Sequence, residues 1–419
     1  MLEVAANSVR RCKVSAALVC VVALVLACGI SLHAKQKKQA APPPKKDPNP
    51  LEVLDYSKIV WPNPPAIARI KYSSQFFGEK RETAAQQKSK EGWMDRLAGV
   101  TAGDVPQNQK LFFQLVTPYG VGVDSKGRIY TADEKVRAVF IYNPETKAVE
   151  MIKNGFQARF HMITGVTLDD GDRLFVSDSD LHHVLVFDKQ NKVEASIGQG
   201  MAVPAGMAVD NENRFLYVAD TGLDQVLVYD ADPPYKFLRS IGTRSGKHDL
   251  TGPGDFSYPT NVAVDADGSL FVSDTFNNRI EVFDAEGKFI RTFGKAGDGP
   301  GYFARPKGIA VDSDGHVWVA DAVQNRVQVF TPEGRLLIWM GGNGLLPGQF
   351  SSLAGLAIDK NNRVVTSEQY PGRVQIFRYV TDAEAKLELA ERDAVAAKKK
   401  AAPTTKEAVV AKPEQPTPK

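Results

Sequence analysis

One pattern recurs six times along this chain and limits its possible folds more than any other feature. Each copy reads Pro-x-Gly-apolar-small-Val-Asp, a turn, an apolar-aromatic-Val-small-Asp segment, a short gap, and a β-branched segment that ends in an aromatic residue. The copy PKGIAVDSDGHVWVADAVQNRVQVF, which begins at Pro306, is typical. The others begin at Pro118, Ile163, Pro204, Pro259 and Leu353. Such repeats indicate small supersecondary units that must stack on one another.

An acidic residue closes the second segment of every copy. Successive acids are 45, 42, 54, 47 and 47 residues apart. Since a side chain present in every copy serves the repeat itself, we interpret these acids as structural, accepting hydrogen bonds from backbone donors and supporting contacts between neighbouring units. They are Asp133, Asp178, Asp220, Asp274, Asp321 and Glu368.

The residues within each copy predict short antiparallel strands. Alternating β-branched and aromatic residues favour strands, and Asp-x-x-Gly segments favour the tight turns that join them. A fourth strand follows most copies, as in FLRSIG, FIRTFG and LLIWMGG. One four-stranded sheet cannot bury both of its faces, so six such sheets must stack around an axis. The predicted fold is all-β, a six-bladed β-propeller over residues 65–380.

The sixth copy ends near Tyr379 without a fourth strand of its own. A matching segment, ARIKYSSQF at residues 68–76, stands before the first copy. We expect this segment to pair with the strand that ends at Tyr379, so that the two ends of the domain close the ring and cover a sheet edge. Residues 79–109 are then an insertion, with a short helix predicted around residues 88–97.

The repeat resembles the NHL family of β-propellers, over roughly residues 65–380. The layout of the chain is similar to that of bacterial exported NHL proteins, which have a lipoprotein-type leader and a proline-rich linker. A WPNPP-like segment precedes their propeller, and here it runs from Trp61 to Pro65. The resemblance therefore implies a propeller that works outside the cytoplasm.

The first 34 residues predict an export signal. Basic residues precede an apolar run at residues 14–32. Cys28 lies in LVLACG, which resembles a bacterial lipobox and predicts lipidation at that residue. The run also has the length of a single transmembrane anchor, and cleavage after Ala34 would instead give a secreted protein. We expect an extracytoplasmic protein anchored to a membrane, in the periplasm or on the outer surface.

Basic character is concentrated at the two ends of the chain. A linker rich in Lys and Pro covers residues 35–64, and the tail at residues 381–419 is expected to form a charged helix from Ala383 to Lys400 before a disordered end. The net charge is +3, of which the ends carry +7 and the folded body −4. The body lacks the basic surface of a nucleic-acid binder, so no nucleic-acid partner is expected. The lysines of the ends favour attraction to anionic lipid or cell-wall polymer.

The candidate ligand site lies in the loops over the central channel. In propellers of this type the loops into the first strands and those between second and third strands share one face. Side chains that differ between copies there are candidates for binding an envelope protein, peptide or polysaccharide. They are Tyr119, His161, His182, His183, Tyr258, Phe276, Arg305, Lys307, Gln324, Tyr370 and Arg373.

A metal-dependent envelope enzyme is the alternative function. In the amidating-lyase relatives of this family, zinc-binding histidines directly follow the proline that opens the first strand. The corresponding residues here are Tyr119, Thr164, Ala205, Thr260, Lys307 and Ala354, and none is histidine. We therefore expect no cofactor and no catalytic residues. A calcium ion held by channel acids, as in lactonase-like hydrolases, stays an alternative.

Overall fold

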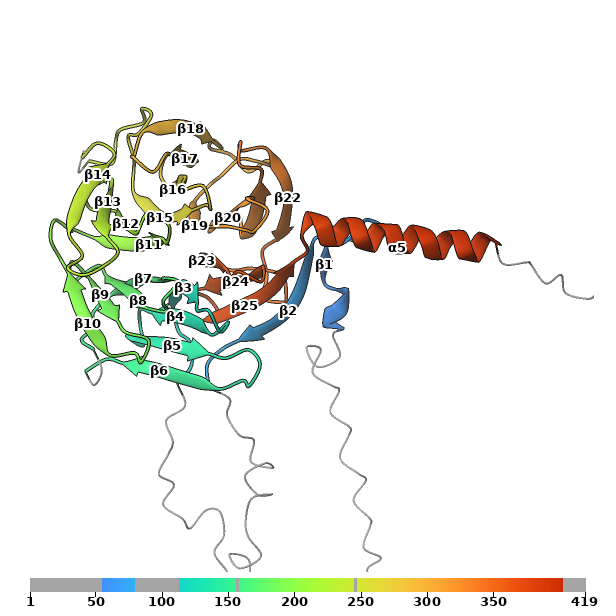
Figure 1. Ribbon diagram of the computed structural model, residues 1–419, viewed down its shortest axis with the longest axis horizontal. Coiled ribbons are helices and arrows are strands. Elements are labelled where there is room, and N and C mark those ends of the chain that lie inside the picture. The colour runs from blue at the N-terminus through green and yellow to red at the C-terminus, as the bar shows by residue number, and fades with distance from the viewer. Residues whose placement is uncertain (1–54, 80–112, 156–157, 245–246, 402–419) are drawn as a thin grey trace, which may run out of the picture. The chain divides into compact units, whose positions relative to one another are not determined.

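The computed structural model describes residues 55–79, 113–155, 158–244 and 247–401. Six antiparallel sheets, here called blades, are arranged around a central axis (Figure 1). The predicted insertion lies largely, and the leader with Cys28 lies wholly, outside the described residues. No helix in the described part of the chain is long and apolar enough to cross a membrane.

Each blade contains four main strands, and the first strand of each lies innermost. Blades one to three contain β3 (Pro118–Val123), β4 (Ile129–Asp133), β5 (Ala138–Tyr142), β6 (Val149–Lys153), β7 (Ile163–Leu168), β8 (Leu174–Asp178), β9 (His183–Phe187), β10 (Val193–Ile197), β11 (Pro204–Asp210), β12 (Phe215–Asp220), β13 (Gln225–Asp230) and β14 (Phe237–Ile241). Blades four to six contain β15 (Pro259–Val264), β16 (Leu270–Asp274), β17 (Arg279–Phe283), β18 (Phe289–Phe293), β19 (Pro306–Val311), β20 (Val317–Asp321), β21 (Arg326–Phe330), β22 (Leu336–Gly341), β23 (Leu353–Ile358), β24 (Arg363–Glu368) and β25 (Arg373–Tyr379).

The apolar core lies between neighbouring blades. Every residue of β4, β8, β16 and β20 is buried, because both faces of these second strands are covered by the blades on either side. Outer strands such as β18 bury only alternate residues. Six apolar clusters result, one at each junction between blades.

The glycine of the Pro-x-Gly motif allows the inner strands to pack closely. A Cβ atom on Gly165 would lie 2.1 Å from the carbonyl oxygen of Ala205 in the next blade. A Cβ atom on Gly355 would lie 2.3 Å from the carbonyl oxygen of Tyr119. Backbone approaches of this kind leave no room for a side chain.

The ring is closed by a strand from the start of the domain, as the sequence predicts. Strand β2 (Ile70–Phe76) pairs with β25, with Ile70 opposite Tyr379 (Figure 1). The structure adds a short fifth strand that we did not predict, β1 (Val60–Trp61), on the outer edge of β2. The Trp61 ring packs edge-on against Phe377 at 5.9 Å. The WPNPP-like segment is therefore partly a cover for the last blade.

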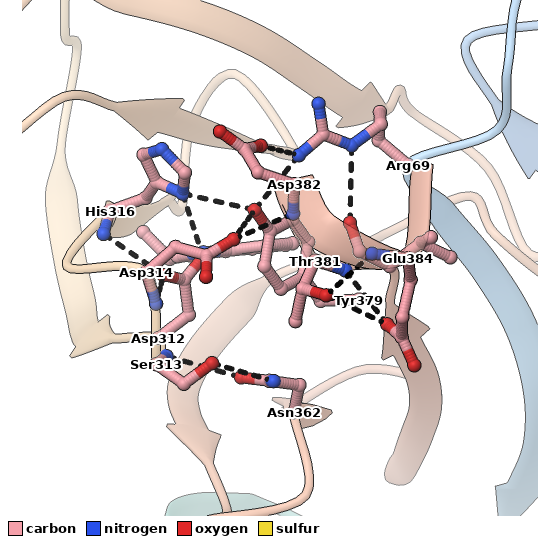
Figure 2. A network of polar contacts seen from close by, with 12 residues as sticks. Arg69, Asp312, Ser313, Asp314, His316, Asn362, Tyr379, Thr381, Asp382 and Glu384 are labelled. Carbon is pink, nitrogen blue, oxygen red and sulfur yellow. Dashed lines mark hydrogen bonds and ion pairs between the residues drawn. The ribbon is translucent and has the colours of Figure 1, made fainter. Parts of the chain in front are cut away.

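Helix α5 (Asp382–Ala401) leaves blade six and covers the residues over which a charged helix was expected. Its start is held by a polar network (Figure 2). The Tyr379 hydroxyl donates to Asp314 Oδ2 at 2.8 Å, and the backbone N–H of Asp382 donates to the same oxygen at 2.9 Å. Arg69, from the start of the domain, donates to the Tyr379 hydroxyl at 3.0 Å. This network joins blades five and six to the first turn of α5.

Candidate functional site

One face of the ring contains the connectors into the first strands and the turns between second and third strands. In blade five, Pro306 lies opposite Asp321 and Asp321 lies opposite Arg326, so all three mark the same end of the sheet. We call this side the connector face. The remaining turns form the opposite face.

The repeated acids hold the connectors in place. Asp133 Oδ2 accepts hydrogen bonds from the backbone N–H groups of Val116 at 2.6 Å and Thr117 at 3.1 Å. Its Oδ1 accepts from Val136 N in the following turn at 2.9 Å. The same connector contact is made by Asp178, Asp220, Asp274, Asp321 and Glu368, and all six acids are fully buried. These are the backbone hydrogen bonds that we expected of the acids.

Links between blades come from hydroxyl groups beside the acids rather than from the acids, which differs from our expectation. Ser177 Oγ donates to the carbonyl oxygen of Ala205 in the next blade at 2.6 Å. Thr275 Oγ1 donates to the carbonyl oxygen of Pro306 at 2.8 Å. Both oxygens of the Asp178 carboxylate are engaged by its own connector and turn, so the neighbouring Ser177 hydroxyl makes the link.

Arg373, which we expected to face a ligand, is buried instead. It is the first residue of the third strand of its blade, and we call this position in each blade the frame position. Arg373 is 1% exposed and donates to Glu368 at 2.8 Å and to the carbonyl oxygen of Gln349 at 2.7 Å. Arg279 and Arg326 begin the third strands of blades four and five and bind connector carbonyls in the same way.

His183 occupies this same frame position in blade two, opposite Asp178. Its Nδ1 lies 3.2 Å from Ser196 Oγ, and burial lowers the pKa of the ring. Gln324 also supports a connector, because its Nε2 donates to Gly297 O at 2.6 Å. Neither side chain is presented freely to a ligand.

In blades four to six, the third residue of the third strand is also buried and binds the connector. Gln328 Oε1 and Gln375 Oε1 each accept a connector N–H at 2.8 Å. Glu281 does the same in blade four, accepting from Gly254 N at 3.0 Å. Burial raises the pKa of the Glu281 carboxyl to about 7. Blade four therefore carries an ionisable group where its neighbours carry an amide.

Replacing Glu281 by Gln is expected to stabilise the protein above neutral pH. Because the folded-state pKa lies above the unfolded value, the folded state holds a proton that the unfolded chain releases, and wild-type stability falls as pH rises from about 4.5 to 7. Removing the ionisable carboxyl is expected to raise the free energy of unfolding by about 1–3 kcal/mol at pH 8 and by much less at pH 5. Chemical denaturation at both values measures it, with Gln328→Glu as the reverse substitution. An unchanged pH dependence in Glu281→Gln would contradict the assignment.

The second residue of each first strand lines the channel, and only two of the six are large. Tyr119 comes from blade one and Lys307 from blade five, with the small Ala354 of blade six between them in the ring. The Lys307 amine lies 5.0 Å from the centre of the Tyr119 ring. The Thr260 hydroxyl is engaged by Thr275 at 2.7 Å. Tyr119 and Lys307 therefore provide the distinctive chemistry of the channel wall.

A stack of side chains continues from this pair across blades four and five. The rings of Tyr258 and Phe276 are stacked at 4.7 Å, and the Arg305 guanidinium lies over the Phe276 ring at 4.5 Å. Tyr119, Tyr258, Phe276, Arg305 and Lys307 are here called the mouth cluster. The structure thus brings five of the residues singled out in the sequence into two contacting groups, Tyr119 with Lys307, and Phe276 with Tyr258 and Arg305.

The electrostatics of the mouth cluster favour an anion. Burial lowers the pKa of the Lys307 amine; Tyr258 raises it, and the nearby charges of Arg305, which lowers it, and Glu134, which raises it, have smaller effects. Burial raises the pKa of Tyr119 to about 12. A partly desolvated amine beside a second cation is stabilised by any negative group that approaches it.

The other histidines that we singled out lie elsewhere, on blade two. His161 Nδ1 is 2.5 Å from Asp180 Oδ2, and His182 Nδ1 contacts the carbonyl oxygen of Ala202. Both are exposed, but neither contacts the mouth cluster among the described residues. In the same described residues, no group of three or more His, Cys, Asp or Glu side chains could hold a metal ion.

Exposed large apolar side chains gather on the connector face, a feature that we did not predict. Tyr370 is 60% exposed there, and Val323 is 62% exposed. In the described part of the opposite face, no turn exposes a large apolar side chain. The signal was available as apolar residues in connector sequence, such as the Leu pair in GNGLLPGQF. The full set is Phe77, Val116, Tyr258, Phe276, Tyr302, Val323, Leu345, Leu346 and Tyr370.

Comparison with known proteins agrees with this architecture. The family DUF5128, described as a 6-bladed beta-propeller, matches residues 255–327. The chain is a six-bladed β-propeller. The propeller is 32% identical over 119 residues to a probable peptidyl-alpha-hydroxyglycine alpha-amidating lyase of Caenorhabditis elegans, covering 27% of this chain and 32% of the relative. It is 48% identical over 44 residues to the protein brain tumor of Drosophila melanogaster, covering 10% of this chain and 4% of that protein.

Two similar solved structures are also enzymes by name. Virginiamycin B lyase from Staphylococcus aureus has a TM-score of 0.47 and 14% identity, covering 63% of this chain and 95% of the lyase. Hydrazine synthase from Kuenenia stuttgartiensis has a TM-score of 0.47 and 12% identity, covering 66% of this chain and 99% of that chain. The curated relatives are matched over a third of their length or less.

Proposed function

We propose that this chain is an exported, NHL-type binding propeller that recognises an envelope protein, peptide or polysaccharide through its connector face. The observation that carries the proposal is the asymmetry between the two faces. Nine large apolar side chains are exposed on the connector face, together with the exposed Arg305 and the partly buried Lys307 of the mouth cluster. The envelope location rests on the sequence of residues 1–34, with Cys28 as the proposed lipidated residue.

The mixture of side chains on the connector face supports a recognition surface. Aromatic residues and arginine are the types enriched in binding hot spots, and clustered apolar side chains on a soluble surface mark places where partners bind. The structure holds these groups on connectors fixed by buried acids, so little ordering is needed when a ligand arrives. A fixed, partly apolar surface is suited to binding.

The double substitution Phe276→Ser with Tyr370→Ser is expected to abolish capture of the envelope ligand. Both rings are exposed, so the melting temperature should change by no more than about two degrees. Affinity capture from envelope fractions, with the full chain as bait, measures the loss against wild type.

The matched control removes apolar side chains of similar exposure from the rim. Leu337→Ser with Trp339→Ser, both 46% exposed on β22, should capture the ligand as wild type does. Loss of capture in the rim variant, with normal capture in the face variant, would place the ligand surface elsewhere.

An amidating-lyase-like or lactonase-like metalloenzyme is the second candidate, favoured by the similarity to the nematode lyase. Elemental analysis of the purified chain and incubation with a peptidyl-α-hydroxyglycine test it. Stoichiometric zinc or calcium together with turnover would favour the enzyme. Binding without either would favour the scaffold or receptor.

A further inference from the structure

Two cations of the mouth cluster differ in their contacts from the arginines that begin the third strands on the connector face. Arg279, Arg326 and Arg373 use their donors on connector carbonyls. Arg305 and Lys307 make no side-chain hydrogen bond or ion pair with any described residue, and their contacts are with aromatic rings. The side-chain donors of these two are therefore not used by the described residues, whereas Arg279, Arg326 and Arg373 each bind the protein's own oxygens.

The stack orients the Arg305 guanidinium for binding. A guanidinium that lies over an aromatic ring directs its N–H donors sideways, in the plane of the group. The Arg305 guanidinium lies 4.5 Å from the centre of the Phe276 ring, and the Tyr258 ring stacks on Phe276 with 4.7 Å between the ring centres. The guanidinium is thus held beside the ring with its donors unpaired by the described residues, and a guanidinium with unpaired donors can bind a carboxylate through two parallel hydrogen bonds.

We propose that Arg305 and Lys307 form a subsite for a carboxylate of a peptide ligand, with the exposed apolar side chains around them taking the neighbouring residues of that peptide. The inference rests on the proposed binding function and names its ligand chemistry. Arg305 supplies a bidentate pair of donors, and Lys307 supplies a point charge two residues further along the chain. Recognition of acidic motifs by clustered cations is a general mode of peptide binding.

The surroundings favour a peptide over an acidic polysaccharide. Leu345, Leu346 and Val323 are about half exposed or more, and their aliphatic groups match the side chains of a peptide rather than sugar hydroxyls. The Phe276 ring is already stacked on Tyr258 and contacted by Arg305, so less of this ring is open to a sugar.

The experiment screens the full chain against a library of short random peptides, prepared in one arm with free C-terminal carboxylates and in the other with amidated ends. Enrichment confined to the free ends identifies a terminal carboxylate, and enrichment of Asp or Glu in both arms identifies a side-chain carboxylate. Either result supports the subsite if Arg305→Gln and Lys307→Gln each weaken the selected peptides on the order of ten-fold. Arg335→Gln, an exposed arginine in a turn of the opposite face, is the control and should bind normally.

Other outcomes separate the subsite from the proposed function. Peptides without carboxylates that lose binding in Phe276→Ser with Tyr370→Ser would overturn the subsite and keep the function. Peptides whose binding ignores every connector-face substitution would overturn both. Binding of polygalacturonate through Arg305 and Lys307, with no selected peptide, would overturn the peptide assignment. Thermal unfolding of each variant verifies that the fold is intact.

Discussion

A chain that lacks residues 66–77 is expected to aggregate rather than fold. The deletion removes β2, so the hydrogen-bonding edge of β25 is left open over seven residues. It also removes Ile70, Tyr72 and Phe76, which are buried in the apolar clusters on both sides of blade six. An open, apolar sheet edge is a template for pairing with other chains. Size-exclusion chromatography and the soluble fraction after expression measure the effect.

The control deletion removes residues 385–419 and leaves the polar network at the start of α5 largely in place. Most of α5 is exposed, so we expect the melting temperature to stay close to that of the full chain. A soluble protein lacking residues 66–77 with unchanged melting temperature would show that β2 does not close the ring.

Replacing Arg373 by Met is expected to destabilise the fold by about 3–5 kcal/mol, because it leaves the buried Glu368 carboxylate without its counter-ion. Both side chains are almost fully buried, and two bonds of 2.8 and 3.0 Å join them. The substitution also removes the Arg373 hydrogen bonds to the connector carbonyls of Leu345 and Gln349, of which Gln349 keeps the one from Gln375. Chemical denaturation of the purified variant measures the loss.

The double variant Arg373→Met with Glu368→Gln tests the cause of that loss. Since the second change removes the uncompensated charge, it should recover a large part of the stability, although the connector carbonyls still lack the Arg373 hydrogen bonds. Equal destabilisation in the single and double variants would show that the charge is not the reason. Arg335→Gln, which changes an exposed arginine, should stay within about 0.5 kcal/mol of wild type.

The strands and the closure of the ring could be predicted because they depend on patterns that repeat. Alternating apolar residues predicted the strands. The last copy lacks a fourth strand, which indicated that the segment before the first copy supplies it. Strand β1 was not predicted because its two residues, Val60 and Trp61, are too few to show an alternating pattern. Their role depends on packing against Phe377, which lies more than three hundred residues away.

The candidate site could be predicted only in part. Tyr258, Phe276 and Arg305 were singled out because they differ between copies, but their stacking depends on how blades four and five meet. Arg373 was placed with them as a side chain that differs between copies and lies between the second and third strands. Only the structure shows that Arg373 is buried and pairs with Glu368, as Arg279 pairs with Asp274 in blade four.

The pairing of β2 with β25 also imposes an order of events on folding. Ile70 is made early in synthesis, whereas its partner Tyr379 is among the last residues of the domain to appear. Blades one to five can each form from a continuous stretch of chain, but blade six has to wait until nearly the whole domain is present. A contact between such distant residues is slow to form because a very long loop must close first. The last blade therefore forms only when the domain is nearly complete, because a chain that ends before β25 has no partner strand for β2.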